Sequence, residues 1–231
     1  MPPAEINLLS AGAVAPGIKK VIDAFGRENG RRVNVAFATA PEILKRLTDA
    51  TSVDVVIAPL AVLDELAKME KISAANRFAL GRIGVGVLVR DNAPLPQIAT
   101  VDEFKQSLLS ADSLVYNQAS TGVYLETLFD RLGIGLETQA KSARYPDFAA
   151  VLDHVSKGAH REIGFGATTV IIENSHKGVK FVGPLPAELQ NYTVYGAAIS
   201  ANEAALNAAR EFLRYLASPS ARSLIAAAGI E

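Results

Sequence analysis

The sequence contains no cysteine and no tryptophan, and its formal net charge is only -1, from 23 basic and 24 acidic residues. The absence of cysteine excludes a disulfide framework, a thiolate metal site and a thiol nucleophile. A net charge this close to zero argues against a nucleic-acid partner, because such binding depends on basic residues that release counterions. No hydrophobic run reaches the roughly 18 residues that a transmembrane helix needs.

The composition that is present is typical of a folded protein. Of the 231 residues, 49% are hydrophobic and 20% are charged, which excludes a disordered chain. The length allows one large domain or two small ones, each with a full core. Three histidines are few for a multi-histidine zinc site, and His160 and His176 have no carboxylate partner at metal-ligand spacing, so we expect no metal site and no cofactor.

The N-terminus leaves the cellular compartment open. Met1 to Ala4 lead directly into the hydrophobic segment Ile6–Leu9, without the basic region, hydrophobic region and small-residue cleavage site of a signal peptide. Either the protein is cytoplasmic, or a signal peptide was removed and replaced by an initiator methionine. In the second case we expect a periplasmic protein.

Segments typical of strands alternate with segments typical of helices from the start of the chain. The first three strands are expected at 6–9, 33–37 and 53–58, and each is followed by a helix with a proline near its start, at Pro16, Pro41 and Pro59. This alternation predicts a parallel sheet with helices on both faces. It resumes after residue 100, with strands expected at 113–116, 142–145, 162–165 and 180–182.

Two long β-prone segments, Leu80–Arg90 and Tyr192–Ile199, interrupt the alternation. We interpret them as strands that carry the chain between two α/β lobes and form a hinge, which lets a cleft close on a ligand. Lobe I is expected at residues 1–82 and 192–231, and lobe II at 83–191. Two helices, expected at 202–216 and 219–228, end the chain.

Small residues follow the first two strands, as Ser10-Ala11-Gly12-Ala13 and Ala38-Thr39-Ala40. Ligands of open α/β sheets bind at the carboxyl ends of the strands. Backbone amides at the helix starts that follow favour anions. We therefore expect both segments to line a cleft, although small residues also suit a tight turn, and Thr39 also suits a helix N-cap.

In element order the chain resembles the type II periplasmic binding proteins, which are solute receptors of ABC transporters, and among them the molybdate-binding-protein-like group. The resemblance is carried by segments that follow strands or open helices, at 8–14, 37–41, 54–58, 116–124 and 162–166. It implies an α/β, two-lobed type II periplasmic binding protein fold with two crossover strands that form a hinge.

The resemblance also implies a set of ligand contacts, with hydroxyls from the first two loops, backbone amides from helix starts of the second lobe and a tyrosine hydroxyl from a late strand. In this chain the two loop positions fall near Ala13 and Ala40, the amides near Thr121 and Phe148, and the tyrosine near Phe165. Three hydroxyls of the pattern are therefore missing, which argues against molybdate itself, because a buried oxyanion needs its donors.

Other side chains offer substitute donors. The helix start Ser120-Thr121-Gly122 is rich in hydroxyls, although Ser120 also suits an N-cap. Arg144-Tyr145 ends a strand, and a carboxylate ligand suits Arg144 no better than solvent or a surface ion pair with Asp147. Tyr192 and Tyr195 lie on the second crossover and could also be half-buried strand aromatics. Asp147 is expected to cap a helix, and His154 to be solvated.

The leading hypothesis is a monomeric solute-binding protein that captures a small anion, an oxyanion or an organic carboxylate, in an interlobe cleft for an ABC transporter permease. It performs no chemistry. A cytoplasmic ligand-sensing domain of the same fold remains an alternative. So does a small-acid lyase or isomerase that uses Asp147, Tyr195 or His154. The candidate site residues are Ser10, Ala11, Gly12, Ala13, Thr39, Ala40, Ser120, Thr121, Gly122, Arg144, Tyr145, Phe148, Phe165, Tyr192 and Tyr195.

Overall fold

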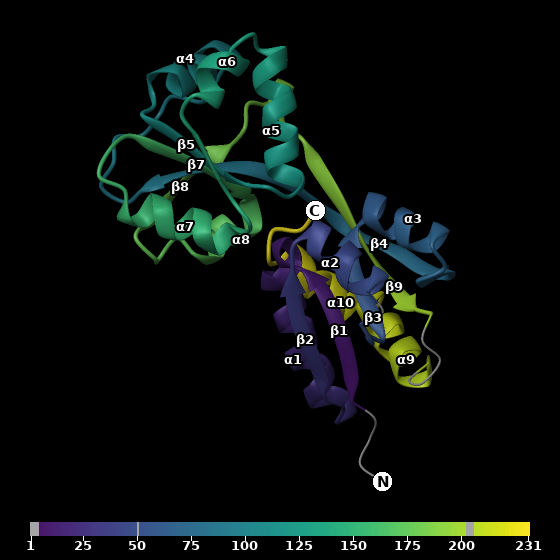
Figure 1. Ribbon diagram of the computed structural model, residues 1–231. Coiled ribbons are helices and arrows are strands. Elements are labelled where there is room, and N and C mark those ends of the chain that lie inside the picture. Colours follow the sequence, from purple (N-terminus) through teal and green to yellow (C-terminus); the bar gives the residue numbers. More distant parts are fainter. Residues whose placement is uncertain (1–4, 50, 202–205) are drawn as a thin grey trace. The chain divides into compact units, whose positions relative to one another are not determined.

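The structure is a computed structural model that describes residues 5–49, 51–201 and 206–231. The chain divides into two compact units (Figure 1). Unit 1 comprises Met1–Ile83 and Thr193–Glu231, and unit 2 comprises Gly84–Tyr192. None of the described helices is both long enough and apolar enough to cross a membrane.

Unit 1 is built on strands that alternate with helices, in the spatial order β2-β1-β3-β9-β4. Strand β1 pairs in parallel with β2 and β3, and β3 pairs antiparallel with β9. The strands are β1 (Ile6–Ala11), β2 (Val33–Ala38), β3 (Val55–Pro59), β4 (Ile72–Arg90) and β9 (Tyr192–Ser200). The helices are η1 (Gly12–Val14), α1 (Ala15–Asn29), α2 (Ala40–Thr48), α3 (Leu60–Lys68), α9 (Leu206–Leu216) and α10 (Pro219–Ala226).

The helices of unit 1 cover both faces of its sheet. Strand β2 lies on one side of β1 and strand β3 on the other, so the chain crosses the sheet in opposite directions through α1 and α2. Because both crossovers are right-handed, the two helices lie on opposite faces of the sheet. Helix α1 packs with α9 and α10, and α2 packs with α3. A Cβ on Gly17 would lie 3.0 Å from Ile230 Cδ1, so glycine allows the close approach of α1 to the C-terminal segment.

Unit 2 repeats this architecture around parallel strands β5, β6 and β7, while β4 pairs antiparallel with β7 and β8. Its strands are β5 (Ser113–Asn117), β6 (Ser142–Tyr145), β7 (Glu162–Ala167) and β8 (Val179–Pro184). Its helices are α4 (Val101–Ser110), α5 (Ser120–Arg131), α6 (Gly135–Gln139), α7 (Phe148–Lys157), α8 (Thr168–Glu173) and η2 (Ala187–Leu189).

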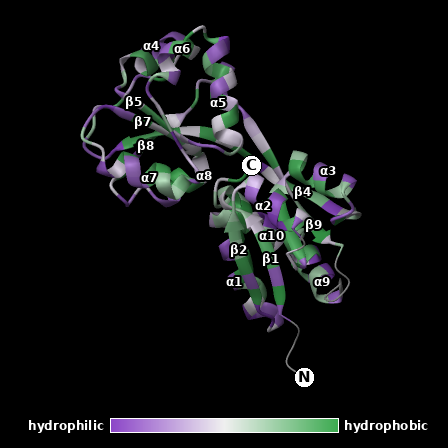
Figure 2. Ribbon diagram, viewed as in Figure 1, coloured by the Kyte–Doolittle hydropathy of each residue, from purple (hydrophilic) through white to green (hydrophobic). Residues whose placement is uncertain are grey.

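Aromatic rings fill the core on one face of the unit 2 sheet. Phe165 on β7 makes edge contacts with Phe104 and Phe129, at centroid distances of 6.4 and 6.3 Å. The other face is packed with aliphatic side chains such as Val151 and Val155 of α7. In Figure 2 the helices of both units carry alternating hydrophobic and hydrophilic residues, which fits helices that each bury one face.

Strand β4 belongs to both units, because the boundary between them falls after Ile83. The expected extended segment at Leu80–Arg90 is present, but the strand begins eight residues earlier than predicted, at Ile72. The low β-propensity of the Ala-Ala-Asn stretch at 74–76 concealed it, and strand pairing prevails over that preference. Strand β9 follows the second predicted segment closely, at Tyr192–Ser200.

The Gln190 side chain ties the two connections between the units together on the unit 2 side. Its Oε1 accepts hydrogen bonds from Val85 N at 2.8 Å and Asn191 N at 2.9 Å, and its Nε2 donates to Val85 O at 2.9 Å. The side-chain amide thus bonds both backbone polar groups of Val85, which is also opposite Ala167 of β7. A Cβ on Gly84 would lie 3.1 Å from Gln190 Cδ, so glycine leaves room for this amide.

Two further differences from the sequence prediction concern short or terminal elements. The five-residue helix α6 was not predicted, because its segment is too short to show a helical period. The helix expected from Asn202 is seen from Leu206, and residues 202–205 lie outside the described part of the chain. The last helix ends at Ala226 rather than at residue 228.

Candidate functional site

In unit 1, the carboxyl ends of three parallel strands lie at the same edge of the sheet. Ala11, the last residue of β1, is opposite Ala38, the last residue of β2, and Ser10 is opposite Ile57 of β3. We call this the unit 1 edge: the ends of β1, β2 and β3 with the helix starts that follow. It brings together Ser10 to Ala13 with Thr39 and Ala40, as the sequence predicted for parallel strands.

The first loop of the unit 1 edge is compact. Ser10 is fully buried, and its hydroxyl donates to Ala11 O over a long 3.3 Å. Ala11 is also buried, while Gly12 and Ala13 are half-buried at the start of η1. A Cβ on Gly12 would meet no atom within 4 Å, so there is open space beside this backbone.

Thr39 is the N-cap residue of α2, but its hydroxyl does not cap the helix. The hydroxyl is therefore not used by the helix amides. Glu42 in the first turn of α2 would oppose an anion, but its carboxylate accepts from Arg46 Nε at 2.8 Å. This hydrogen bond lowers the pKa of Glu42. Ala40 begins the helix, and Pro41 beside it has no amide proton to offer.

Tyr195 reaches the unit 1 edge from β9, where it is opposite Pro59, the last residue of β3. Its side chain is 6% exposed. Burial raises the pKa of Tyr195 to about 12, and a hydrogen bond with the Thr193 side chain acts in the opposite direction. Tyr195 is therefore a neutral hydroxyl at physiological pH. Tyr192, three residues earlier, is 39% exposed.

Unit 2 has an equivalent edge, which we call the unit 2 edge: the ends of β5, β6 and β7 with the helix starts that follow. Asn117 at the end of β5 is opposite Tyr145 at the end of β6, and Val115 is opposite Gly164 of β7. Helices α5, α7 and α8 begin within three residues of these strand ends. The positive ends of these helix dipoles thus point toward one edge.

Ser120 and Thr121 are the first two residues of α5, and neither is its N-cap, which is Ala119. Asn117 Oδ1 accepts instead from Ala119 N at 3.0 Å. Gly122 has a structural reason to be glycine, because a Cβ there would lie 1.7 Å from Asn117 O. The start of α5 therefore lies directly against the end of β5.

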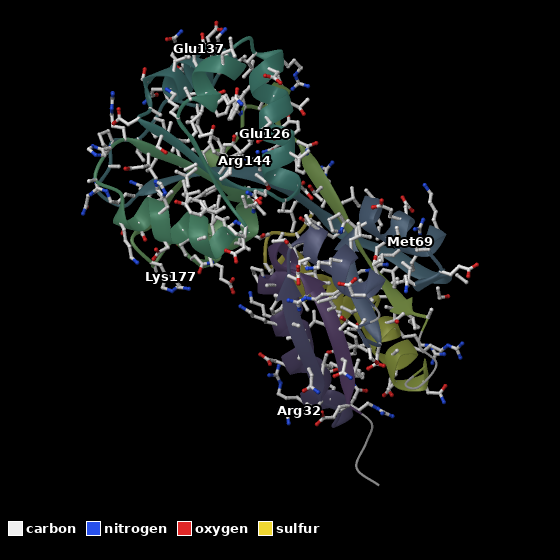
Figure 3. All side chains as sticks on the ribbon, viewed as in Figure 1. Arg32, Met69, Glu126, Glu137, Arg144 and Lys177 are labelled. Atoms are coloured by element: carbon white, nitrogen blue, oxygen red, sulfur yellow. The ribbon has the colours of Figure 1, made fainter. Side chains whose placement is uncertain are left out.

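Arg144 and Tyr145, adjacent on β6, contact different helices. Arg144 Nε pairs with Glu126 Oε1 of α5 at 2.9 Å, and the two side chains are 45% and 40% exposed (Figure 3). The Tyr145 hydroxyl hydrogen-bonds His154 Nδ1 of α7 at 2.7 Å. His154 is thus not simply solvated, as the sequence had suggested. The surface ion pair of Arg144 is formed with Glu126 and not with Asp147, whose carboxylate caps α7.

The start of α7 is fixed by two contacts. Asp147 accepts from Ala150 N at 2.9 Å, which confirms its predicted role as a helix cap. The Phe148 ring lies against the end of β7, because a Cβ on Gly166 would come within 2.5 Å of Phe148 Cε2. The aromatic ring of Phe148 therefore packs within unit 2, and its backbone amide belongs to the first turn of α7.

Phe165 does not lie at the unit 2 edge. Its side chain is fully buried among Phe104, Phe129 and other core residues. A side chain in this position is inaccessible to a ligand, so we leave it out of the proposed site. The resemblance implied a ligand-binding tyrosine near Phe165 because β7 has the same place in the order of elements. Element order does not show which face of the sheet a residue lies on, since alternate residues of a strand face opposite sides.

Comparison with known proteins places the chain in a family. The sequence profile of a family described as bacterial extracellular solute-binding protein matches residues 6–231. The chain belongs to the bacterial extracellular solute-binding proteins. It is also 30% identical over 236 residues to an aconitate isomerase from Pseudomonas sp., a match that covers 100% of this chain and 88% of that protein.

Solved structures confirm the fold predicted for this solute-binding protein. The periplasmic molybdate-binding protein of Azotobacter vinelandii is similar with a TM-score of 0.81 and 17% identity, over 98% of both chains. The sulfate-binding protein of Mycobacterium tuberculosis is similar with a TM-score of 0.77 and 18% identity, over 98% of this chain and 86% of the other. The chain has the type II periplasmic binding protein fold, and the resemblance to the molybdate-binding-like group is confirmed.

Sequence reasoning missed two hydroxyl groups of this solute-binding protein that lie near the edges. Thr168 begins α8, directly after β7, at the unit 2 edge. Thr193 supports Tyr195 beside the unit 1 edge. The small-residue signal that revealed Ser10 to Ala13 also occurs at Gly166-Ala167-Thr168 and would have found the first. Thr193 gives no such signal, because its role depends on a strand neighbour.

Proposed function

We propose that the chain binds a small organic carboxylate anion, and that the unit 1 edge and the unit 2 edge supply the groups that bind it. The observation that carries the proposal is that each unit gathers hydroxyls and helix starts at the carboxyl ends of its parallel strands. Such edges are where open α/β sheets bind ligands. Membership in the extracellular solute-binding family supports a binding function.

The unit 1 edge supplies neutral donors. The Thr39 hydroxyl is not used as a cap, and the buried Tyr195 hydroxyl keeps its proton because its pKa is raised to about 12. A neutral donor can bind an anion without losing a proton or changing its own charge. Ser10, whose hydroxyl makes a long 3.3 Å hydrogen bond to Ala11 O, adds a third hydroxyl near the end of β1.

The unit 2 edge supplies backbone amides and positive helix ends, from α5 and α7. Arg144 adds the side chain best suited to a carboxylate, through two parallel hydrogen bonds. Its pair with Glu126 is half-exposed, and exposed pairs contribute only about 0–1 kcal/mol. Exchanging Glu126 for a ligand carboxylate therefore costs little.

The proposed cellular role is that of a receptor for a transporter. The ligand would be delivered to the permease of an ABC transporter, by a monomeric protein that acts in the periplasm. The family description as extracellular supports this location, and the fold supports the role of a receptor that closes on its solute. The alternative is a cytoplasmic sensor of the same fold. In that case the same ligand would regulate the sensor.

A panel of ligands tests the proposal by titration calorimetry. We expect micromolar binding of at least one di- or tricarboxylate among succinate, citrate, tricarballylate and the two aconitate isomers. Molybdate, tungstate and sulfate should bind at least 100-fold more weakly, because hydroxyls are missing at Ala13 and Ala40 and each hydrogen bond to a charged group contributes about 1.5–3 kcal/mol. Submicromolar molybdate binding with silent carboxylates would contradict the proposal.

Replacing Thr39 with alanine tests whether its hydroxyl contacts the ligand or stabilises the start of α2. The variant should bind its carboxylate about 10- to 150-fold more weakly, since it loses one charge-assisted hydrogen bond. Its melting temperature should be unchanged, because the hydroxyl does not cap α2.

The matched control for Thr39→Ala is Ser218→Ala. The Ser218 hydroxyl accepts from Ala221 N at 3.2 Å and caps α10. This variant should lose about 1 kcal/mol of stability and keep its ligand affinity. A Thr39→Ala protein that melts earlier but binds normally would show that this hydroxyl has no part in the site.

A second candidate function is isomerisation of an unsaturated tricarboxylate. The 30% identity with an aconitate isomerase along the whole chain favours it. Moving a double bond or reversing its geometry by proton transfer needs a base that takes a proton and returns it. The three candidate bases are engaged or protonated: Asp147 caps α7, His154 Nδ1 is bonded to Tyr145, and the pKa of Tyr195 is raised.

Incubation with trans-aconitate, followed by proton nuclear magnetic resonance, distinguishes the two candidates. A binding protein should leave the vinyl proton signal of the ligand unchanged over hours. Appearance of the cis isomer at a rate proportional to protein concentration would make the isomerase the correct function. Variants His154→Gln and Asp147→Asn would then show which side chain moves the proton.

A further inference from the structure

Unit 1 contains a second feature that the proposed function does not use, a surface pocket of about 400 Å³ formed by β4, β9 and α9. Three arginines line it, Arg77, Arg210 and Arg214, together with apolar residues that include Phe78, Ile199 and Leu213. Its lining residues include none of those at the unit 1 edge. A pocket of this volume lies within the range of small-molecule sites.

Among the described residues that line this pocket none is acidic, so they do not balance its positive charge. Arg210 and Arg214 lie four residues apart on α9, where like charges repel. Among the described residues neither guanidinium has an ion-pair partner. By contrast, Arg31 pairs with Glu211, and Arg46 pairs with Glu42.

Arg77 is the third arginine, and it already has a partner outside the pocket lining. Its Nη1 pairs with Asp64 of α3. The side chains of this pair are 34% and 52% exposed, so the pair is weak. The pocket therefore offers two uncompensated guanidiniums from α9 and a third that is partly compensated from β4.

We infer that this pocket is a second anion site, and that it takes a flat organic dicarboxylate. A guanidinium binds a carboxylate through two parallel hydrogen bonds, so Arg210 and Arg214 together match two carboxylates. Side chains at this helical spacing have Cβ atoms about 5–6 Å apart, which suits carboxylates on one ring. The apolar lining residues, among them Phe78, take the body of the ligand, and guanidinium planes also stack on aromatic faces.

Titration calorimetry with benzene-1,3-dicarboxylate tests this inference on the full chain. We expect submillimolar binding that weakens as salt is raised, because the arginines are exposed. The double variant Arg210→Ala with Arg214→Ala should bind at least tenfold more weakly. The neutral analogue benzene-1,3-dimethanol should not bind. Arg222→Ala is the control, since Arg222 is an exposed arginine of α10 in the same unit and does not line the pocket.

Backbone amide spectra locate the site independently of affinity. The dicarboxylate should shift the amide signals of Ile199, Leu213 and their neighbours, and leave those of Ser10 and Thr39 unchanged. A second double variant, Arg210→Gln with Arg214→Gln, keeps the length of the side chains and should lose the same binding. The inference is wrong if the dicarboxylate is silent at millimolar concentration, if both double variants bind it normally, or if its shifts map to the unit 1 edge.

Discussion

Replacing Phe165 with alanine is expected to lower the free energy of unfolding by about 3–5 kcal/mol. The ring is fully buried and contacts Phe104 and Phe129 by their edges, so truncation leaves a cavity in the core of unit 2. Chemical denaturation measures the loss. Phe165→Leu, which fills most of the cavity, should lose less.

The same position tests where the family's tyrosine role falls in this chain. Phe165→Tyr adds a hydroxyl inside the aromatic core, where burial without a partner costs about 1–3 kcal/mol. The variant should therefore be less stable and should gain no affinity for molybdate. If Phe165→Tyr bound molybdate tightly at full stability, the ring would have to reach the ligand, and our placement of the core would be incorrect.

Gly122→Ala is the second substitution with a large expected effect. The added methyl would lie 1.7 Å from Asn117 O, so the start of α5 must move away from β5. Overpacking of this kind costs about 1–3 kcal/mol. Because the amides of α5 belong to the unit 2 edge, ligand affinity should fall together with the melting temperature.

Gly12→Ala is the matched control in unit 1. A Cβ there meets no atom within 4 Å, so stability should change by less than about 0.5 kcal/mol. The methyl would occupy the open space beside the first loop, so ligand binding should weaken although the fold is intact. A normal affinity in Gly12→Ala would show that this space is not part of the site.

The sequence predicted the features that depend on the order of elements along the chain and on the spacing of hydrophobic residues. Hydrophobic segments followed by small residues located β1 and β2, and parallel pairing then required Ser10 and Thr39 to lie at one edge. The same reasoning, with the resemblance to a known family, predicted the type II fold. Asp147 as a cap of α7 followed from its place before a helical segment.

Contacts between side chains on different elements were not predictable in this way. Arg144 pairs with Glu126, which is 18 residues earlier, and Tyr145 bonds His154 on the next helix. Adjacent residues of β6 contact different helices because strand side chains alternate between faces, and the sequence does not reveal which face each helix covers. The early start of β4 depended on pairing rather than on local preference.

The Gln190 amide has a mechanical consequence for the chain. Two segments far apart in the sequence, at Val85 and Asn191, could otherwise slip in register against each other. Since Gln190 is bonded to both Val85 and Asn191, the two connections cannot slide past each other where they enter unit 2. Val85 and Asn191 therefore keep a fixed register where both segments meet in unit 2.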